Sequence, residues 1–456
     1  MKGIKMININ KNFPSLIKYM GSKTEIIKFI EYGINMIHRN NQPICDLFAG
    51  SATLSGALRG KCDIISNDIQ SYSEILAKTY LNTYSWDEYP TIEQLCDIAQ
   101  ERVERFNNEF HQFNNFNYNV EFDLDEFNRL EKEQQQLINF EGLENFDDYY
   151  LYTKYYSGTY WSYNQCVWID SIKYVADQYK HIEPLYDSII SSLMYAMAYN
   201  SQSTGHYAQY RDATTIRSMD DILIYRRKSI REFFVRKFTE LTETFNDTNN
   251  REFTTSSLDY MDCLNNLEEG TLVYADPPYC FVHYSRFYHA IETLIRYDYP
   301  DVAHKGRYRE DRYQSPFCIK TQVNKAFQSM FNIIKDKKLD LVLSYSNSET
   351  NTIALIDLLT SACVTLNNIT NEDQIENIRV NIENLIDQPI LRDYIITEQE
   401  QYQVINITND DFFKGNIDRK YTLRLAMVNY NHSTMGRRED RLKQVKEILI
   451  VAKLRR

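Results

Sequence analysis

The chain has 456 residues, of which 43% are hydrophobic and 25% are charged, as expected for a globular protein with two domains or one domain with large insertions. No run approaches the roughly 18 apolar residues of a membrane-spanning helix, and residues 1–13 lack the apolar core of a signal peptide, which favours a cytoplasmic protein. The formal net charge of −12 argues against a polyanionic partner unless basic residues gather locally.

The first predicted elements form a β-α-β unit. Residues 43–60, PICDLFAGSATLSGALRG, predict a short buried strand, a turn of small residues and a helix, and residues 62–68, CDIISND, predict a second strand. The first strand ends at Asp46, and the turn holds Phe48 and Gly50. Backbone N–H groups at such a turn, next to a helix N-terminus, can cradle a nucleotide-like ligand.

Asp68 stands at the end of the second strand, 22 residues after Asp46. A carboxylate at this place can accept hydrogen bonds from ribose hydroxyls. A dinucleotide site would need the pattern GxGxxG, and the turn has only one of these glycines, Gly50. Taken separately, these two signals also fit a Rossmann-like scaffold without a cofactor.

The centre of the chain is polar, aromatic and helical in pattern. Residues 86–180 include the helical spacing of IEQLCDIAQERVERF and an Asn-rich patch that favours a loop or a helix end. The tyrosine-rich run 149–156 is more typical of helix packing than of a stacking platform. The basic segments 226–237 and 437–456 each favour either a solvated helix face or a contact with a polyanion.

Strand patterns return in the second half of the chain, at 252–260, 271–279, 339–348, 402–408 and 420–430. The sheet is therefore predicted from both ends of the chain, with a mostly helical insertion between them. We expect an α/β fold in which helices cover both faces of a Rossmann-like sheet.

The strand at 271–279 contains the motif VYADPPY. Proline cannot donate to a sheet, so the strand should stop at Asp276, at the edge where open α/β sheets bind their ligands. An exocyclic amine on an aromatic ring is a poor nucleophile, and its hydrogens need acceptors as the nitrogen becomes tetrahedral. Asp276 and the carbonyl of Pro277 can supply these acceptors. Pro278 stiffens the loop, and Tyr279 can stack on an extruded base.

These motifs, in this order, resemble the Dam-type (D12 class) family of S-adenosylmethionine-dependent DNA adenine N6-methyltransferases. The similar segments are LIKYMGSK (16–23) for the N-terminal cofactor segment, DLFAGSAT (46–53) for the glycine turn, SND (66–68) for the ribose-binding acid, SSLDY (256–260) for the strand end at the cofactor adenine, and ADPPY (275–279) for the catalytic motif. The turn departs from the family at Ser51 and Ala52, where relatives often carry more glycine.

The resemblance implies roles for individual residues. The catalytic residues it implies are Asp276, Pro277, Pro278 and Tyr279. The residues it implies for binding S-adenosylmethionine are Tyr19, Lys23, Asp46, Phe48, Gly50, Asp68, Asp259 and Asp276. It further implies a bacterial or phage-encoded protein whose partner is double-stranded DNA, and it is compatible with a separate restriction endonuclease acting on the same site.

Target recognition is expected in residues 198–212, AYNSQSTGHYAQYRD, which stand where this family has a polar and basic hairpin in the DNA groove. Such side chains read base edges or contact phosphates, although a hydrogen-bonded surface loop has the same composition. The predicted DNA contacts are Asn200, Gln202, His206, Gln209, Arg211, Arg226, Arg227 and Arg307.

The expected domain organisation follows from these motifs. It comprises a cofactor-binding part of the catalytic domain (1–86), a helical insertion with the DNA target-recognition region (87–250), the catalytic part with the DPPY motif (251–350), and a helical extension with the closing strands of the sheet (351–456).

Other functions stay open. The same motif serves N4-cytosine methylation of DNA or adenine methylation of RNA, although Asp276 resembles the adenine enzymes because Ser is common in the cytosine enzymes. The fold also suits a non-catalytic DNA-binding subunit. No metal site is expected, since no carboxylate completes the ligand spacing of the histidines after the motif. The eight scattered cysteines predict buried free thiols of a reducing compartment.

Overall fold

The computed structural model describes residues 6–203, 206–278, 284–348, 350–386, 402–408, 419–433 and 442–456. Within these residues, one sheet contains the strands β1 (Ile44–Asp46), β2 (Ile64–Asn67), β3 (Phe253–Ser256), β4 (Leu272–Ala275), β7 (Asp340–Ser346), β8 (Gln403–Asn406), β9 (Tyr421–Ser433) and β10 (Leu442–Leu454). A small hairpin contains β5 (Val302–Ala303) and β6 (Tyr308–Arg309).

The strand order in the sheet is β3-β2-β1-β4-β7-β10-β9-β8. The first five strands in this order are parallel, and β10, β9 and β8 continue the sheet with antiparallel pairs. All five strand patterns in the second half of the sequence are confirmed as β3, β4, β7, β8 and β9. Parallel strands end at one edge of the sheet, so their last residues meet there.

Helices cover both faces of the sheet, as predicted. Along β4, Leu272 and Tyr274 pack towards the helices α1 to α3, whereas Val273 and Ala275 pack towards α11, α13 and α14, because successive side chains of a strand point to opposite faces. The helices are α1 (Ile27–Asn35), α2 (Thr53–Leu58), α3 (Ser71–Leu81), α11 (Tyr260–Asn266), α13 (Val323–Asp336), α14 (Leu355–Leu366) and α15 (Glu372–Ile386).

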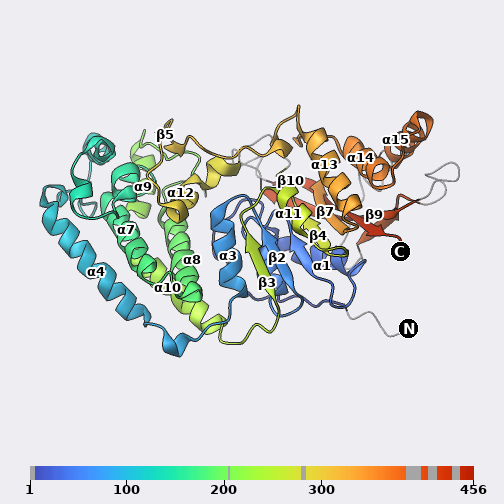
Figure 1. The fold of residues 1–456 in the computed structure, drawn as a ribbon. Coiled ribbons are helices and arrows are strands. Elements are labelled where there is room, and N and C mark those ends of the chain that lie inside the picture. Colours follow the sequence, from blue (N-terminus) through green and yellow to red (C-terminus); the bar gives the residue numbers. More distant parts are fainter. Residues whose placement is uncertain are drawn as a thin grey trace.

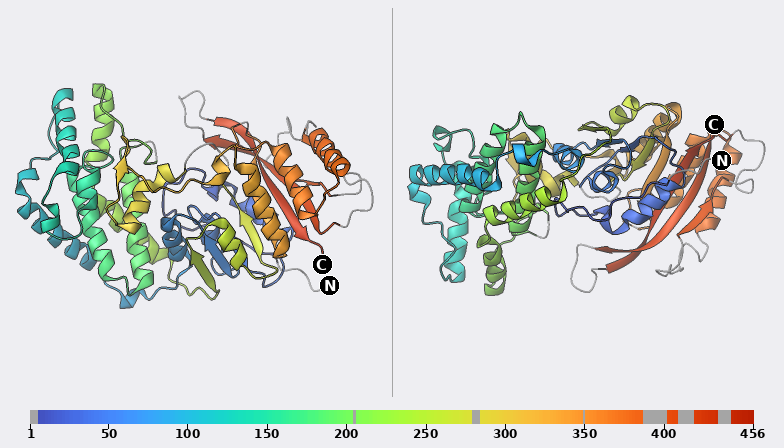
Figure 2. Two further views of the ribbon diagram at one scale, coloured as in Figure 1. Left: turned by 45° about the horizontal axis from the view of Figure 1, so that its top comes forward. Right: turned by 90° about the horizontal axis from the view of Figure 1, so that it is seen from below.

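The remaining helices form a second body beside the sheet (Figure 1). They are α4 (Ile92–Glu109), α5 (Leu124–Gln135), α6 (Leu151–Tyr156), α7 (Tyr163–Gln178), α8 (Glu183–Asn200), α9 (Ile216–Arg226), α10 (Ile230–Thr244) and α12 (Tyr284–Arg296). Figure 2 shows this helical region and the sheet at opposite ends of an elongated molecule. The helix predicted at IEQLCDIAQERVERF is confirmed as α4, and Tyr152 and Tyr156 are buried in helix packing.

Helix α3 joins the two bodies. It packs on the sheet through its apolar face, while Thr79 Oγ1 and Ser191 Oγ of α8 lie 2.6 Å apart and Asn82 donates a 2.9 Å hydrogen bond to Asp187. Part of the segment expected in the catalytic domain also lies in the helical region, since the carbonyl of Phe287 in α12 accepts a 2.7 Å hydrogen bond from the Tyr207 N–H.

The C-terminal segment differs from its prediction. Residues 437–456 were expected to be either a solvated helix face or a contact with a polyanion, but Leu442–Leu454 form the strand β10 between β7 and β9. Residues 448–452 of this strand are buried. The lysines and arginines at its two ends hid the short continuous apolar run ILIVA, which is typical of a strand buried on both faces.

Candidate active site

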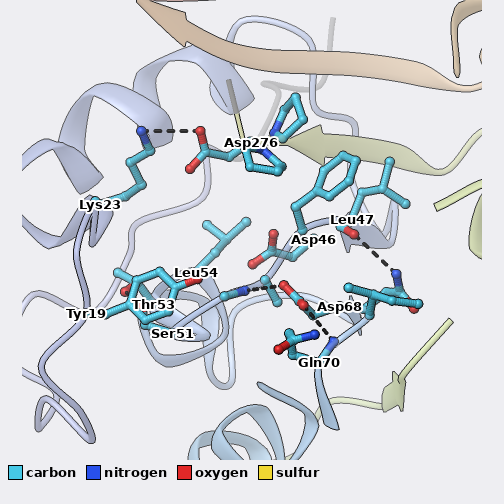
Figure 3. A pocket seen from close by; sticks show the side chains of 18 of the residues that line it. Tyr19, Lys23, Asp46, Leu47, Ser51, Thr53, Leu54, Asp68, Gln70 and Asp276 are labelled. Atoms are coloured by element: carbon cyan, nitrogen blue, oxygen red, sulfur yellow. Dashed lines mark hydrogen bonds and ion pairs between the residues drawn. The ribbon is translucent and has the colours of Figure 1, made fainter. Parts of the chain in front are cut away.

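A cavity opens at the carboxyl ends of β1, β2 and β4, with about 1320 Å³ of empty space that includes its open mouth. Among the residues that line it are Tyr19, Lys23, Asp46, Phe48, Gly50, Asp68, Asp276, Pro277 and Pro278. These residues come from four separate segments of the sequence, and Figure 3 shows several of their side chains converging on one space. The structure therefore brings together the predicted glycine turn, the ribose-type acid and the proline motif.

The glycine turn after β1 closes tightly. Gly50 has a φ of 53° and Ala52 a φ of 54°, both in the left-handed region. A Cβ atom on Gly50 would lie 2.9 Å from the hydroxyl of Tyr19, so the turn and Tyr19 are in close contact only because residue 50 has no side chain. The ring of Tyr19 in turn stacks on Tyr288 with centroids 4.5 Å apart.

Asp68 is tied to this turn by its carboxylate. One oxygen, Oδ2, accepts a 2.9 Å hydrogen bond from the Gly50 N–H, and Oδ1 accepts a 2.9 Å hydrogen bond from the Gln70 N–H (Figure 3). Burial raises the pKa of Asp68 to about 6, although the two backbone N–H groups oppose that shift. The acid is therefore held in a fixed orientation on the cavity wall and still titrates in an accessible pH range.

Asp46 is a buried acid on the cavity wall. Burial raises its pKa well above the usual value, and the negative charges of Asp276 and Asp68 raise it further. Its Oδ1 atom is buried and has no hydrogen-bond partner among the described residues. A buried acceptor without a partner is a cost to folding, so Asp46 is suited to a ligand that brings a hydrogen-bond donor or positive charge.

Asp276 follows β4 directly, and Pro277 and Pro278 complete the wall beside it. Lys23 Nζ lies 3.3 Å from Asp276 Oδ1 and 3.9 Å from Glu447 Oε1, so one ammonium stands between two carboxylates. The side chain of Asp276 is 18% exposed and faces the cavity. Tyr279, the last residue of the predicted catalytic motif, lies outside the described residues.

Two residues of this site were missed in the sequence. Asn67 is buried and joins the strand ends: its Nδ2 donates to the carbonyls of Leu47 and Leu258, and its Oδ1 accepts from Ser256 and the Leu258 N–H. Its place before Asp68 was the available signal. Glu447 had no such signal, because its strand was not predicted.

Phe48 and Asp259 lie at one side of the cavity. The ring of Phe48 contacts Tyr260 and Phe317, with centroids 6.1 and 5.4 Å away. Asp259 caps α11 by accepting a 2.9 Å hydrogen bond from the Met261 N–H. Its other oxygen accepts a hydrogen bond from the Tyr313 hydroxyl. Its neighbours Leu258 and Tyr260 line the cavity, so Asp259 shapes this wall through the backbone.

The predicted DNA-contacting segment after α8 is largely turned inward. Asn200 and Gln202 are fully buried, and Gln202 bonds to the backbone of Thr159 and to both backbone groups of Arg211. His206 is also buried, with its ring 4.5 Å from Phe287. The described part of 198–212 contains no strand, so it shows no hairpin of the expected kind.

The arginines predicted to contact DNA include both buried and exposed side chains. Arg226 is buried in a two-bond ion pair with Glu131, and Arg307 donates to the carbonyls of Tyr155 and Gln135. Arg227 is exposed, as is Gln209, and Arg211 is half-buried. The segment 226–237 is therefore neither a uniformly solvated helix face nor a uniform basic patch. Arg227, Arg231 and Arg236 are exposed in this segment.

Within the part of the chain that the structure describes, no three His, Cys, Asp or Glu side chains are grouped as a metal ion would require. Across the same residues, every helix is too short or too polar to span a bilayer. The seven cysteines among the described residues are buried free thiols, as predicted.

Comparison with known proteins gives a consistent result. The profile of the D12 class N6 adenine-specific DNA methyltransferase family matches residues 19–166 and 186–340. The modification methylase LlaI of Lactococcus lactis subsp. lactis is 23% identical over 338 residues, which cover 73% of this chain and 46% of that protein. The type II methyltransferase M.FokI of Planomicrobium okeanokoites is 23% identical over 346 residues, covering 73% and 44%. The chain thus spans less than half the length of these curated relatives.

Proposed function

The chain belongs to the D12 class N6 adenine-specific DNA methyltransferase family, and we propose that it transfers a methyl group from S-adenosylmethionine to the N6 amine of adenine in DNA. The observation that carries the proposal is that Asp68 and Asp276 line one cavity at the carboxyl ends of β2 and β4. The first acid is placed for a ribose and the second for an amine, so cofactor and acceptor would meet in one space.

The residues on the cavity wall fit this cofactor. Gly50 and Tyr19 form part of the cavity wall, and a side chain at position 50 would collide with the Tyr19 ring. Asp68 offers a carboxylate to ribose hydroxyls. The buried Oδ1 of Asp46 has no hydrogen-bond donor among the described residues, and the positive charge of a cationic ligand can offset the cost of burying it. S-adenosylmethionine supplies an electrophilic methyl group on a sulfonium. Tyr19, Lys23 and Phe48 complete the proposed binding residues.

Asp276 acts on the acceptor. Its carboxylate and the Pro277 carbonyl accept hydrogen bonds from the exocyclic amine. These bonds hold the amine as its nitrogen becomes tetrahedral, so the nitrogen lone pair is free to attack the methyl group. Pro277 and Pro278 keep the backbone of this acceptor pair from relaxing between turnovers. Tyr279 is proposed to stack on the extruded adenine.

Duplex DNA is the proposed partner, and the helical region is proposed to carry target recognition. Among the predicted contacts, Gln209 and Arg227 are exposed and Arg211 is half-buried, and these three remain in this proposal. Arg227 also donates to the carbonyls of Tyr118 and Val120. Contacts from Asn200, Gln202, His206, Arg226 and Arg307 would first require a change of their present protein partners. A separate restriction endonuclease acting on the same sequence fits the names of the two relatives, which are modification enzymes.

Methyl transfer from labelled S-adenosylmethionine to unmethylated DNA of mixed sequence, followed by nucleoside analysis, tests the proposal. Wild type should place the label in N6-methyladenine. Asp276→Ala should lower the rate about 10²- to 10³-fold, because a preorganised acceptor is removed. Asp262→Ala, a change of an exposed acid in α11, is the matched control and should leave the rate unchanged.

Each other outcome has a definite meaning. Label in N4-methylcytosine would keep the mechanism and change the target base. Transfer to RNA alone would change the nucleic acid. Binding of DNA without binding of S-adenosylmethionine, measured by calorimetry, would support a non-catalytic subunit and contradict the proposal.

A further inference from the structure

Glu447 projects from the same face of the sheet as Asp276, although the two residues are 171 positions apart in the sequence. In β4, Tyr274 faces the helices α1 to α3, and Asp276 follows it by two positions. In β10, Leu449 faces the same helices and lies against Gly33 of α1, and Glu447 precedes it by two positions. Both acids therefore point towards the segment that begins at Lys23 and leads into α1.

The strand β7 separates the two acids and leaves room between them. Glu447 pairs with Ser346, and Leu449 pairs with Ser344. Both serines are buried and have short side chains. The start of this part of β10 is fixed to the end of β7 by two hydrogen bonds between Asn347 and Lys446, of 2.8 and 3.1 Å. The position of Glu447 is thus set by sheet pairing on both sides.

Lys23 is the cation shared by the two acids. Its Nζ lies 3.3 Å from Asp276 Oδ1 and 3.9 Å from Glu447 Oε1. Exposure falls along the series, from 18% for Asp276 to 12% for Lys23 and 1% for Glu447. Glu447 therefore lies behind the lysine, away from the cavity.

Packing alone does not account for this acid. A carboxylate buried beside Leu449 and Val451 loses its hydration, and an apolar residue of similar size would avoid that loss. The contact with Lys23 gives the acid a specific partner, and this partner is the lysine that also contacts Asp276. A buried charge placed behind a functional cation is an arrangement that orients the cation.

We propose that Glu447 is a positioning residue for methyl transfer: it holds the Lys23 ammonium beside Oδ1 of Asp276, the acid that accepts a hydrogen bond from the substrate amine. Without Glu447, the ammonium loses one of these two carboxylate contacts and can shift relative to Asp276. The Asp276 carboxylate is then less well placed to accept a hydrogen bond from the amine. This inference rests on the proposed function, because Glu447 is assigned a role in orienting the groups around Asp276, the catalytic residue of that function.

The first test compares wild type, Glu447→Gln and Glu447→Asp in single-turnover methyl transfer from S-adenosylmethionine to DNA. Glu447→Gln keeps the shape and removes the charge, and it should lower the rate about 10- to 100-fold, as a displaced positioning group does. The dissociation constant for S-adenosylmethionine should stay within about threefold. Glu269→Gln, at an exposed ion pair with Lys338, is the control and should behave as wild type.

A double-mutant cycle with Lys23→Met separates positioning from a general structural effect. If Glu447 acts through Lys23, the double variant should be no slower than Lys23→Met alone, because the second change removes an interaction that is already lost. Rates that fall by the product of the two single effects would contradict the proposal.

The pH profile supplies a readout that loss of packing would not move. The alkaline limb of the rate should shift to lower pH by about one unit in Glu447→Gln, because the ammonium loses one of two neighbouring negative charges. Among the described residues, Asp276 and Tyr274 also face it, and Asp46 interacts with Asp276; all three stay in the variant. Glu447→Asp should retain the wild-type profile at a reduced rate.

The outcomes distinguish this inference from the proposed function. No methyl transfer by wild type would remove the proposed function. Equal rates and equal pH profiles for wild type and Glu447→Gln would remove only the role of Glu447. If Glu447→Gln does not fold, Glu447→Asp decides: a wild-type rate would overturn the proposal, since the shorter side chain widens a 3.9 Å contact.

Discussion

Charges are buried in two parts of this molecule, and their surroundings differ. In the helical region, Arg226 forms two hydrogen bonds with Glu131 and a third with the carbonyl of Thr159. Asp170 accepts hydrogen bonds from Tyr152, Thr153 and Tyr297. At the sheet edge, burial and the negative charges of Asp276 and Asp68 raise the pKa of Asp46, and Asp46 Oδ1 has no partner among the described residues.

The difference separates structural charges from functional ones. A buried ion that is saturated by protein partners supports the fold, and its removal leaves the other partner stranded. Acids that face one another across a cavity destabilise the ligand-free fold and become favourable when a ligand brings donors or positive charge. Changes in the helical region should therefore affect stability first, and changes at the sheet edge should affect ligand binding and catalysis first.

The largest expected effect on stability comes from Glu131→Gln. The variant leaves Arg226 buried with no carboxylate opposite it, so the free energy of unfolding should fall by about 3–5 kcal/mol. Denaturant unfolding followed by circular dichroism measures this change. Cofactor affinity of the folded protein should stay as in wild type. A variant as stable as wild type would contradict the structural role of the pair.

Gly50→Ala should weaken binding of S-adenosylmethionine about tenfold, by calorimetry, because its Cβ would approach the Tyr19 hydroxyl to 2.9 Å and deform the cavity wall. Gly60→Ala is the matched control. Gly60 has a φ of 69° and no atom within 4 Å of an added Cβ, so this variant carries a similar backbone strain of roughly 1–2 kcal/mol without touching the cavity. Equal loss of affinity in both variants would show that strain alone is responsible.

A smaller effect is expected from pH. The pKa of Asp68 is raised to about 6 by burial, so its ionisation costs the ligand-free fold stability as the pH rises through that value. Ribose hydroxyls donate more strongly to the ionised form. Affinity for S-adenosylmethionine should therefore rise by up to about tenfold per unit below pH 6 and level off above it.

The variant Asp68→Asn isolates this contribution. Asp46 and Glu292 are neighbouring acids and remain in the variant, so a flat affinity profile in Asp68→Asn would assign the pH dependence to Asp68. A profile that keeps the wild-type slope would assign it to one of the other acids instead.

The sequence by itself determined the elements that have local signals. Side-chain periodicity predicts the strand, small-residue turn and helix at 43–60, and the missing N–H of proline predicts that the later strand stops at Asp276. The structure has β1 and α2 in the first segment, and β4 ends at Ala275. The meeting of these segments at one edge also follows, because parallel strands end together. The family was therefore recognisable from the residues alone.

Tertiary structure decided which charges are available. Arg226 and Arg227 are neighbours with the same side chain, yet one is buried against Glu131 and the other is exposed. Glu447 is placed behind Lys23 only by the pairing of β10 with β7 and β9, strands distant from Lys23 in the sequence. Periodicity describes neighbours along the chain, whereas burial and ion pairing depend on contacts that long-range sheet pairing and helix packing create.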